Sequence, residues 1–131
     1  MNSCFLAPLQ GYTDHIWRTA HKNVFNTIDC YFSSFIRVEH GAIRRKDIRD
    51  ISPENNPDTN LIPQILACAP NDASLITQKI EELGYTNIDI NLGCPFPLIA
   101  RKQKGAGMLA QPDKVEDLFV ALSKFDRIKY S

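Results

Sequence analysis

The sequence predicts an α/β fold in which parallel strands alternate with helices, and three observations support this prediction. Short apolar segments rich in β-branched and aromatic residues alternate with amphipathic segments of helical period along the 131 residues. One strand and one helix recur about every 30 residues, a spacing typical of βαβ units in a parallel sheet. Polar residues follow several of the expected strands, and α/β barrels place their active sites at such positions.

The first expected unit begins with the strand Phe5-Leu6-Ala7, which we expect to be buried and to end at Pro8. A turn follows, in which Thr13 or Asp14 is suited to cap the next helix. That helix is expected over residues 14–24. Its predicted inner stripe consists of Ile16, Trp17, Ala20 and Val24.

The second strand is expected over residues 31–38, with Arg37 near its end. The polar segment that continues to residue 60 predicts one short helix and a long loop. Residues 61–67 predict the third strand, although Pro63 is awkward there because proline removes a backbone donor. Gln64 places a polar side chain within this apolar run.

The next helix is expected to be capped by Asn71 or Asp72 and to end at Gly84. Residues 86–91 predict the fourth strand, and Pro112 suits the start of the last helix. The inner stripes of the two helices are expected to be Ala73, Ile76, Ile80 and Leu83, and Val115, Leu118, Phe119 and Leu122. Residues 128–130 could begin a fifth strand.

Four strands are too few to close a (β/α)8 barrel, which takes about 250 residues. The chain is therefore either a small open sheet or, as we prefer, the first half of a barrel. Its 44% hydrophobic and 23% charged residues are typical of a globular protein, and no apolar run has the roughly 18–20 residues that span a bilayer. Without a signal peptide, we expect a cytoplasmic protein with free cysteines and no membrane contact. The net charge of zero leaves two local basic patches, residues 44–46 and 101–104, which could also be solvated loops.

Polar groups occur at or near the ends of three expected strands. Pro8-Leu9-Gln10 follows the first strand, Gln64 lies in the third, and Asn91 and Cys94 follow the fourth. In a parallel barrel these ends meet on one face, so a single ligand could touch all of them. Gln64 and Asn91 could instead be buried amides that satisfy loop groups.

Cys94 lies between Gly93 and Pro95, where we expect no core for it to fill. A nucleophilic thiolate would need a base, and none of the three histidines is obviously placed to serve as one. The four cysteines form no CxxC pair and a single thiol has no partner ligand, so no metal is expected. The remaining role is that of a neutral thiol that donates a proton. Nucleotide-binding signatures are missing, and the glycine pair of residues 105–107 is a weak signal by itself.

With these residues in view, the chain resembles the tRNA-dihydrouridine synthases, flavin-dependent (β/α)8 barrels. The motifs that carry the resemblance are Ala7–Asp14, Gln64, Asp89–Pro95, and Lys104–Leu109 with Pro112. The resemblance implies an α/β fold of the (β/α)8 TIM-barrel type, of which residues 1–131 hold about the first four β/α units, the N-terminal half of an FMN-binding barrel. The C-terminal half, its phosphate-binding loops and a helical tRNA-binding domain would then lie beyond Ser131.

The resemblance also implies roles for individual residues. Pro8, Leu9 and Gln10 match the segment that lies along FMN, and Gln64 matches the glutamine that hydrogen-bonds the flavin ring. Asn91 matches an asparagine near the flavin and the target uridine, and Cys94 matches the proton donor. In family terms NADPH reduces FMN, a hydride passes to C6 of a tRNA uracil, and the cysteine protonates C5.

Residues 35–38 resemble a second-strand signature of the bacterial DusC-like subclass, in which the arginine contacts tRNA. This match makes Arg37 a candidate substrate contact, and a surface ion pair with Glu39 is the alternative. Two other functions stay open: an FMN-dependent barrel oxidoreductase for a small molecule, such as a dihydropyrimidine or enoate, and a non-catalytic truncated fragment. A half-barrel would expose sheet edges and could self-associate through them. We do not expect independent catalysis by the 131-residue chain alone.

Overall fold

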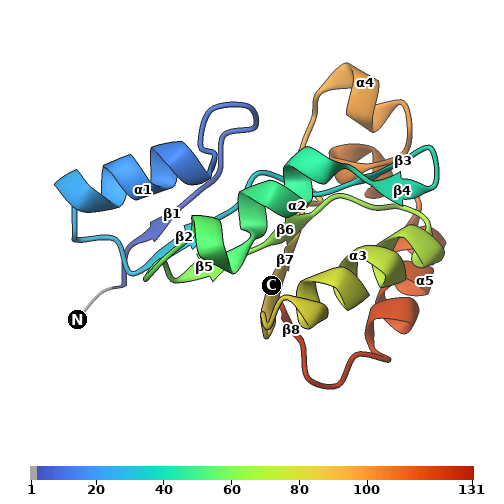
Figure 1. Cartoon of the computed structure of the whole chain (residues 1–131). Helices are drawn as coiled ribbons and strands as arrows, with labels where there is room; N and C mark the ends of the chain where they lie inside the picture. Colours follow the sequence, from blue (N-terminus) through green and yellow to red (C-terminus); the bar gives the residue numbers. More distant parts are fainter. Residues whose placement is uncertain (1–2) are drawn as a thin grey trace.

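Short parallel strands run through the centre of the protein in the same order as in the chain (Figure 1). The computed structural model describes residues 3–131. The sheet strands are β1 (Phe5–Leu6), β2 (Cys30–Phe32), β5 (Leu61–Ile62), β6 (Gln64–Ile65), β7 (Asn87–Ile90) and β8 (Lys129–Tyr130). β1 pairs with β2 and β2 with β5, while β6 pairs with β7 and β7 with β8, all in parallel. The predicted α/β class with parallel strands is therefore confirmed, and so is the fifth strand.

Pro63 divides the expected third strand into β5 and β6. β5 pairs with β2, whereas β6 pairs with β7. Because proline has no backbone N–H, it cannot donate to the ladder, and the next amide, Gln64 N, donates to the Ser33 hydroxyl at 3.0 Å. Farther along the chain, a single parallel bridge between Ile36 and Ile65 pairs the segment after β2 with β6.

The expected strand over residues 31–38 is shorter than predicted and ends at Phe32. An antiparallel hairpin follows instead, formed by β3 (Val38–Glu39) and β4 (Ala42–Ile43). Its turn residues His40 and Gly41 both have positive φ, 52° and 77°, as a tight two-residue hairpin turn requires. Arg37 therefore lies directly before a hairpin rather than near the end of a long sheet strand.

The helices largely follow the prediction. They are α1 (His15–Val24), α2 (Arg45–Ile51), α3 (Pro70–Glu82), α4 (Pro97–Ala100) and α5 (Pro112–Leu122), with 3₁₀ turns η1 (Pro53–Asn55) and η2 (Gly105–Met108). Asp14 caps α1 as expected, because its Oδ1 accepts a hydrogen bond from Trp17 N at 2.9 Å. The expected cap of α3 is wrong: the helix begins at Pro70, before Asn71 and Asp72, and has no side-chain cap. Within residues 3–131, no helix is long and apolar enough to cross a lipid bilayer.

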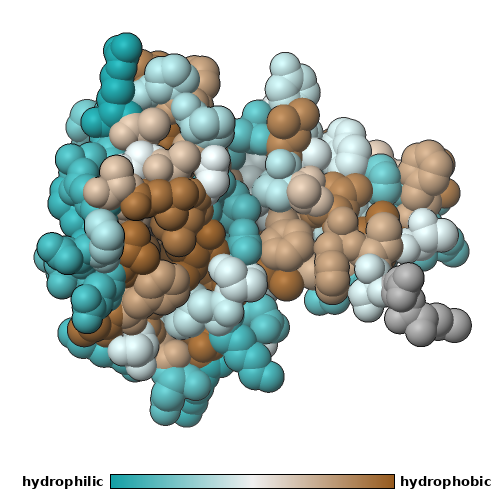
Figure 2. All heavy atoms as spheres, turned by 180° about the vertical axis from the view of Figure 1, so that it is seen from behind, coloured by the Kyte–Doolittle hydropathy of each residue, from teal (hydrophilic) through white to brown (hydrophobic). Residues whose placement is uncertain are grey.

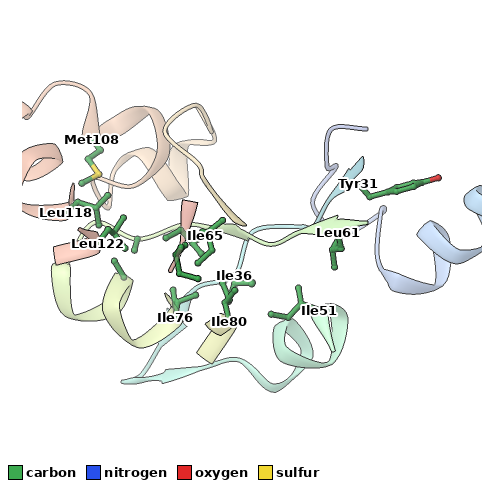
Figure 3. Packing of buried hydrophobic residues seen from close by; sticks show 14 residues of the cluster. Tyr31, Ile36, Ile51, Leu61, Ile65, Ile76, Ile80, Met108, Leu118 and Leu122 are labelled. Atoms are coloured by element: carbon green, nitrogen blue, oxygen red, sulfur yellow. The ribbon is translucent and has the colours of Figure 1, made fainter. Parts of the chain in front are cut away.

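The main core lies between the strands and helices α3 and α5. Ile65, Ile76 and Ile80 are completely buried, and Figure 3 shows them close together between strand and helix. Leu118 and Leu122 of α5 complete the cluster, as the helical period predicts. Phe119 was expected to face inward too, but 43% of its surface is exposed.

The apolar residues of α1 do not face the core, which corrects the predicted inner stripe. Ile16 and Val24 are 68% and 72% exposed, Trp17 is 37% exposed and Ala20 is also exposed. Phe5 in β1 is 60% exposed, so the first strand is an open edge rather than a buried strand. Figure 2, which shows the opposite face, displays apolar side chains near the N-terminal residues and a hollowed apolar patch on the other half of the molecule.

α1 is instead attached through Arg18, whose side chain is fully buried. Its guanidinium donates to Thr13 O at 2.8 Å, to Asp50 Oδ2 at 3.1 Å and to Asp50 O at 2.7 Å. Asn56 Oδ1 accepts a further hydrogen bond from Arg18 at 2.9 Å. A buried charge is tolerated only with such partners, so this network fixes α1 to α2 and η1.

Candidate functional site

Side chains from two neighbouring strands form a chain of hydrogen bonds at the carboxyl end of the sheet. Gln64 Nε2 on β6 donates to Asp89 Oδ2 on β7 at 2.7 Å. Asn91 Nδ2, directly after β7, donates to Gln64 Oε1 at 2.9 Å. Parallel neighbours bring these residues together although 25 to 27 positions separate them in the chain. The structure therefore joins Gln64 and Asn91, as the sequence predicted, and adds Asp89, which the prediction missed.

Asn91 also holds the backbone of the cysteine loop. Its Oδ1 accepts hydrogen bonds from Cys94 N at 2.9 Å and from Gly93 N at 3.2 Å. The amide of Asn91 thus bonds the loop with its oxygen and Gln64 with its nitrogen. This arrangement gives Asn91 a positioning role, because it fixes the point at which the chain turns towards Cys94.

The backbone carbonyl oxygen of Cys94 accepts a hydrogen bond from the 3₁₀ turn η2. Ala106 N donates to Cys94 O at 3.0 Å. Gly105 has φ +56°, and a Cβ on it would lie 2.7 Å from Cys94 O and 2.9 Å from Cys94 Cβ. A Cβ on Gly107 would lie 2.2 Å from Ala100 O. Both glycines therefore permit a close backbone approach, Gly105 to the cysteine loop and Gly107 to the end of α4. The glycine pair that was a weak signal in the sequence thus allows η2 to pack against both segments.

Cys94 is half-buried and lines an open pocket of about 550 Å³. It packs against a small cluster formed by Phe35, Leu66 and Ile99. The pocket lining combines apolar side chains with cations and is formed by Gln10, Phe35, Arg37, Val38, Glu39, Cys94, Phe96, Leu98, Ile99, Lys102 and Lys104. This volume lies within the range of pockets for small molecules and planar rings. The sequence did not predict the apolar wall from α4, because apolar residues of a short loop helix have no periodic pattern.

Gln10 reaches this pocket, but its neighbours do not. Gln10 Oε1 accepts a hydrogen bond from Phe35 N at 2.9 Å, which ties the loop after β1 to the segment after β2. Leu9 is 59% exposed and Pro8 is half-buried. In the part of the chain that the structure describes, neither Pro8 nor Leu9 lines the pocket of Cys94.

Arg37 lines the same pocket and forms the ion pair that was the alternative expectation. Its Nη2 lies 2.5 Å from Glu39 Oε1, and its guanidinium carbon lies 5.9 Å from the centre of the Phe35 ring. Although desolvation raises the pKa of Glu39, its hydrogen bond with Arg37 and the charges of Arg37 and Arg44 give a net lowering. Glu39 therefore stays ionised and holds the guanidinium at the pocket wall.

The cysteines are free thiols, and Cys30 is buried whereas Cys4 is exposed. Burial, with a smaller contribution from the charge of Asp29, raises the pKa of Cys30. Across residues 3–131, no group of three or more His, Cys, Asp or Glu side chains is arranged to hold a metal ion. Cys94 is thus the one thiol that lines the pocket at the carboxyl end of the described sheet.

Comparison with known proteins agrees with this arrangement. The chain is 28% identical over 123 residues to a tRNA-dihydrouridine(16) synthase of Shewanella oneidensis, and this match covers 89% of the chain and 39% of the relative. It is 31% identical over 119 residues to tRNA-dihydrouridine synthase B of Pasteurella multocida, with coverage of 89% and 35%. A probable tRNA-dihydrouridine synthase of Staphylococcus aureus (strain Mu50) is 27% identical, with coverage of 88% and 36%.

The chain therefore spans little more than a third of the length of these relatives. The family model described as "Dihydrouridine synthase (Dus)" matches residues 5–129. Because this match covers nearly the whole chain, the protein belongs to the dihydrouridine synthase family.

Proposed function

We propose that this chain forms part of a cytoplasmic tRNA-dihydrouridine synthase that reduces the C5–C6 double bond of a uridine in tRNA, with FMN as cofactor and NADPH as electron donor. The observation that carries the proposal is a half-buried thiol, Cys94, fixed on both sides of its backbone at the edge of a pocket in a member of this family. Residues 1–131 would be the N-terminal half of a TIM barrel, completed by further strands and a helical tRNA-binding domain.

The polar groups at the sheet edge fit the ring of a flavin. A glutamine amide has two N–H donors and two acceptor lone pairs, and Gln64 uses one of each on Asp89 and Asn91. One donor and one acceptor of Gln64 therefore remain for a ring that carries both. Gln10 uses its oxygen on Phe35 N and keeps its amide donors, and Pro8 and Leu9 would lie along the cofactor. When bound, FMN reduced by NADPH supplies the hydride that goes to C6 of the uracil.

Cys94 then supplies the proton. Its Sγ–H donates the proton to C5 of the uracil, so the double bond is saturated, and the sulfur takes up a new proton from solvent. The hydrogen bonds from Asn91 and Ala106 hold the backbone of Cys94, and fixed positioning of the donor group favours such a transfer.

The target uridine would have to leave its stack to reach Cys94. The apolar wall from Phe35 and α4 offers a surface for the flat base, and the pocket volume of about 550 Å³ accommodates it. Arg37 lies at the same wall and would contact the RNA, exchanging its ion pair with Glu39 for a phosphate or base. We also propose membership of the DusC-like subclass, on the resemblance of residues 35–38 to its signature.

The test uses the complete natural polypeptide that contains this chain. We expect it to bind flavin, with absorbance near ~450 nm, and to form dihydrouridine in tRNA isolated from a strain that lacks the modification. Cys94→Ala should lower the rate by roughly 10²–10⁴-fold while flavin binding is retained. Unchanged dihydrouridine formation by Cys94→Ala would refute the proton-donor role.

The same preparations distinguish the other functions. Turnover of free uracil or an enoate without tRNA would favour a small-molecule oxidoreductase. A polypeptide without flavin and without activity would favour the non-catalytic fragment, for which we propose self-association through open sheet edges.

A further inference from the structure

A second, smaller pocket adjoins the pocket of Cys94 at Gln10. Its volume is about 180 Å³, and Gln10 lines both pockets. The lining of the smaller pocket is mainly polar and consists of Gln10, Gly11, Asp14, His15, Ser34, Lys46, Asp47, Arg49 and Asp50. The two pockets are therefore neighbours at Gln10, with α2 lining the smaller one and Cys94 the larger one.

The acidic residues that line these two pockets already have partners. Three of them bind arginines and the fourth caps a helix: Asp47 binds Arg44 at 2.7 Å, Asp50 binds Arg18 at 3.1 Å, Glu39 binds Arg37 at 2.5 Å, and Asp14 caps α1. The charges of Asp47, Asp50 and Glu39 are neutralised by these arginines, whereas Asp14 is exposed and has no cationic partner among the described residues. Asp14 therefore offsets only part of the charge of the remaining cations, Lys46 and Arg49.

Lys46 and Arg49 are the cations that remain at the smaller pocket. Both side chains are exposed, and within residues 3–131 neither has an ion-pair or hydrogen-bond partner for its charged group. They are three positions apart on α2, so they lie on the same side of the helix as neighbours. Lys102, at the far end of the larger pocket, is exposed and likewise lacks an acidic partner among the described residues.

We infer that Lys46 and Arg49 bind phosphates of the RNA strand whose extruded base enters the pocket of Cys94. This inference rests on the proposed function and extends it to a surface on the side of Gln10 away from Cys94. Nucleic-acid strands are bound chiefly through their phosphates, and two exposed cations without acidic partners, next to the pocket proposed for the base, are suited to such contacts. The net charge of the chain is zero, so the attraction comes from this local surface.

The experiment compares two double variants of the complete polypeptide that carry the same change of charge. Lys46→Gln with Arg49→Gln removes the proposed contacts. Lys124→Gln with Arg127→Gln removes two exposed cations that precede β8, at the opposite end of the strands. Neither pair of charged groups has a partner in residues 3–131, so all variants should keep the stability of the wild type.

The measurement is the dissociation constant for tRNA as a function of potassium chloride concentration. For Lys46→Gln with Arg49→Gln we expect roughly tenfold weaker binding near 0.1 M salt and a log–log slope that is smaller in magnitude by about 1.4–1.8. The Lys124/Arg127 variant should retain the wild-type slope. Flavin content should be the same in all three proteins.

Each other outcome overturns the inference in a recognisable way. Equal slopes for the two double variants would refute these phosphate contacts while the wild-type activity still supports the proposed function. If the variant Lys46→Gln with Arg49→Gln loses flavin but binds tRNA like the wild type, Lys46 and Arg49 would instead bind the phosphate of the cofactor. A wild type that binds no tRNA and forms no dihydrouridine would remove the proposed function together with the inference.

Discussion

Substitution of Gly105 by alanine should displace Cys94, the proposed proton donor, without changing the chemical nature of its side chain. An alanine Cβ would lie 2.7 Å from Cys94 O, whereas ordinary van der Waals contact begins at 3.4 Å, so one of the two segments must retreat by roughly 0.7 Å. The positive φ of +56° adds a backbone penalty for any residue with a side chain. That penalty is about 1–2 kcal/mol and overpacking adds about 1–3 kcal/mol, so we expect the unfolding free energy to fall by about 2–5 kcal/mol.

Displacement of η2 should also move Cys94, because Ala106 N in η2 donates a hydrogen bond of 3.0 Å to Cys94 O. A shift of about 1 Å in a reacting group can cost roughly 10²-fold in rate. We therefore expect Gly105→Ala to slow dihydrouridine formation about 10- to 100-fold at saturating tRNA. In the 131-residue chain itself, the alkylation rate of Cys94, followed by mass spectrometry, should change several-fold while that of Cys4 stays constant.

Gly93→Ala is the matched control in the same loop. A Cβ on Gly93 has no atom within 4 Å, and the alanine keeps the N–H that donates to Asn91 Oδ1. We expect this variant to match the wild type in urea denaturation, alkylation and activity. The reasoning is refuted if Gly105→Ala behaves like Gly93→Ala in all three measurements.

Two further predictions concern stability. Arg18→Met should lower the unfolding free energy by about 3–5 kcal/mol, because it leaves Asp50 and Asn56 without their buried partner. Urea denaturation measures this loss, and a loss below about 1 kcal/mol would contradict the role assigned to the network. Burial raises the pKa of Tyr85, the charge of Arg18 lowers it and the charge of Asp50 raises it, with a net increase. The contribution of Tyr85 to stability is therefore complete below its unfolded pKa of about 10 and is lost as pH rises through the folded value. Tyr85→Phe should therefore weaken the decline of unfolding free energy above about pH 10, and an unchanged decline would rule out this titration.

Much of the site was predictable because it depends on strand order. Strand and helix alternation follows from local composition, and the carboxyl ends of parallel strands must meet at one edge. Gln64 and Asn91 therefore had to lie close together, as their hydrogen bond of 2.9 Å confirms. The unusual position of Cys94 between Gly93 and Pro95 was likewise visible in the sequence, and it lines the pocket at that edge.

The close packing of η2 against Cys94 was not predictable from local pattern. Gly105 lies eleven positions after Cys94, and its role depends on how closely two loop backbones approach. Glycines in a polar loop are equally compatible with a simple turn. Only the tertiary structure shows that a side chain at Gly105 would clash with the backbone of Cys94.

By itself, the sequence determined the α/β class, the order of the strands, the family and the polar groups at the sheet edge. Only the tertiary structure decided how α1 packs, since its apolar stripe is exposed and its attachment is the buried Arg18. The partners of Arg18, Asp50 and Asn56, lie 32 and 38 positions away. Helical periodicity describes which residues share a face, but a buried ion pair between distant segments can outweigh it, because an unpaired charge in the interior costs more than an exposed isoleucine.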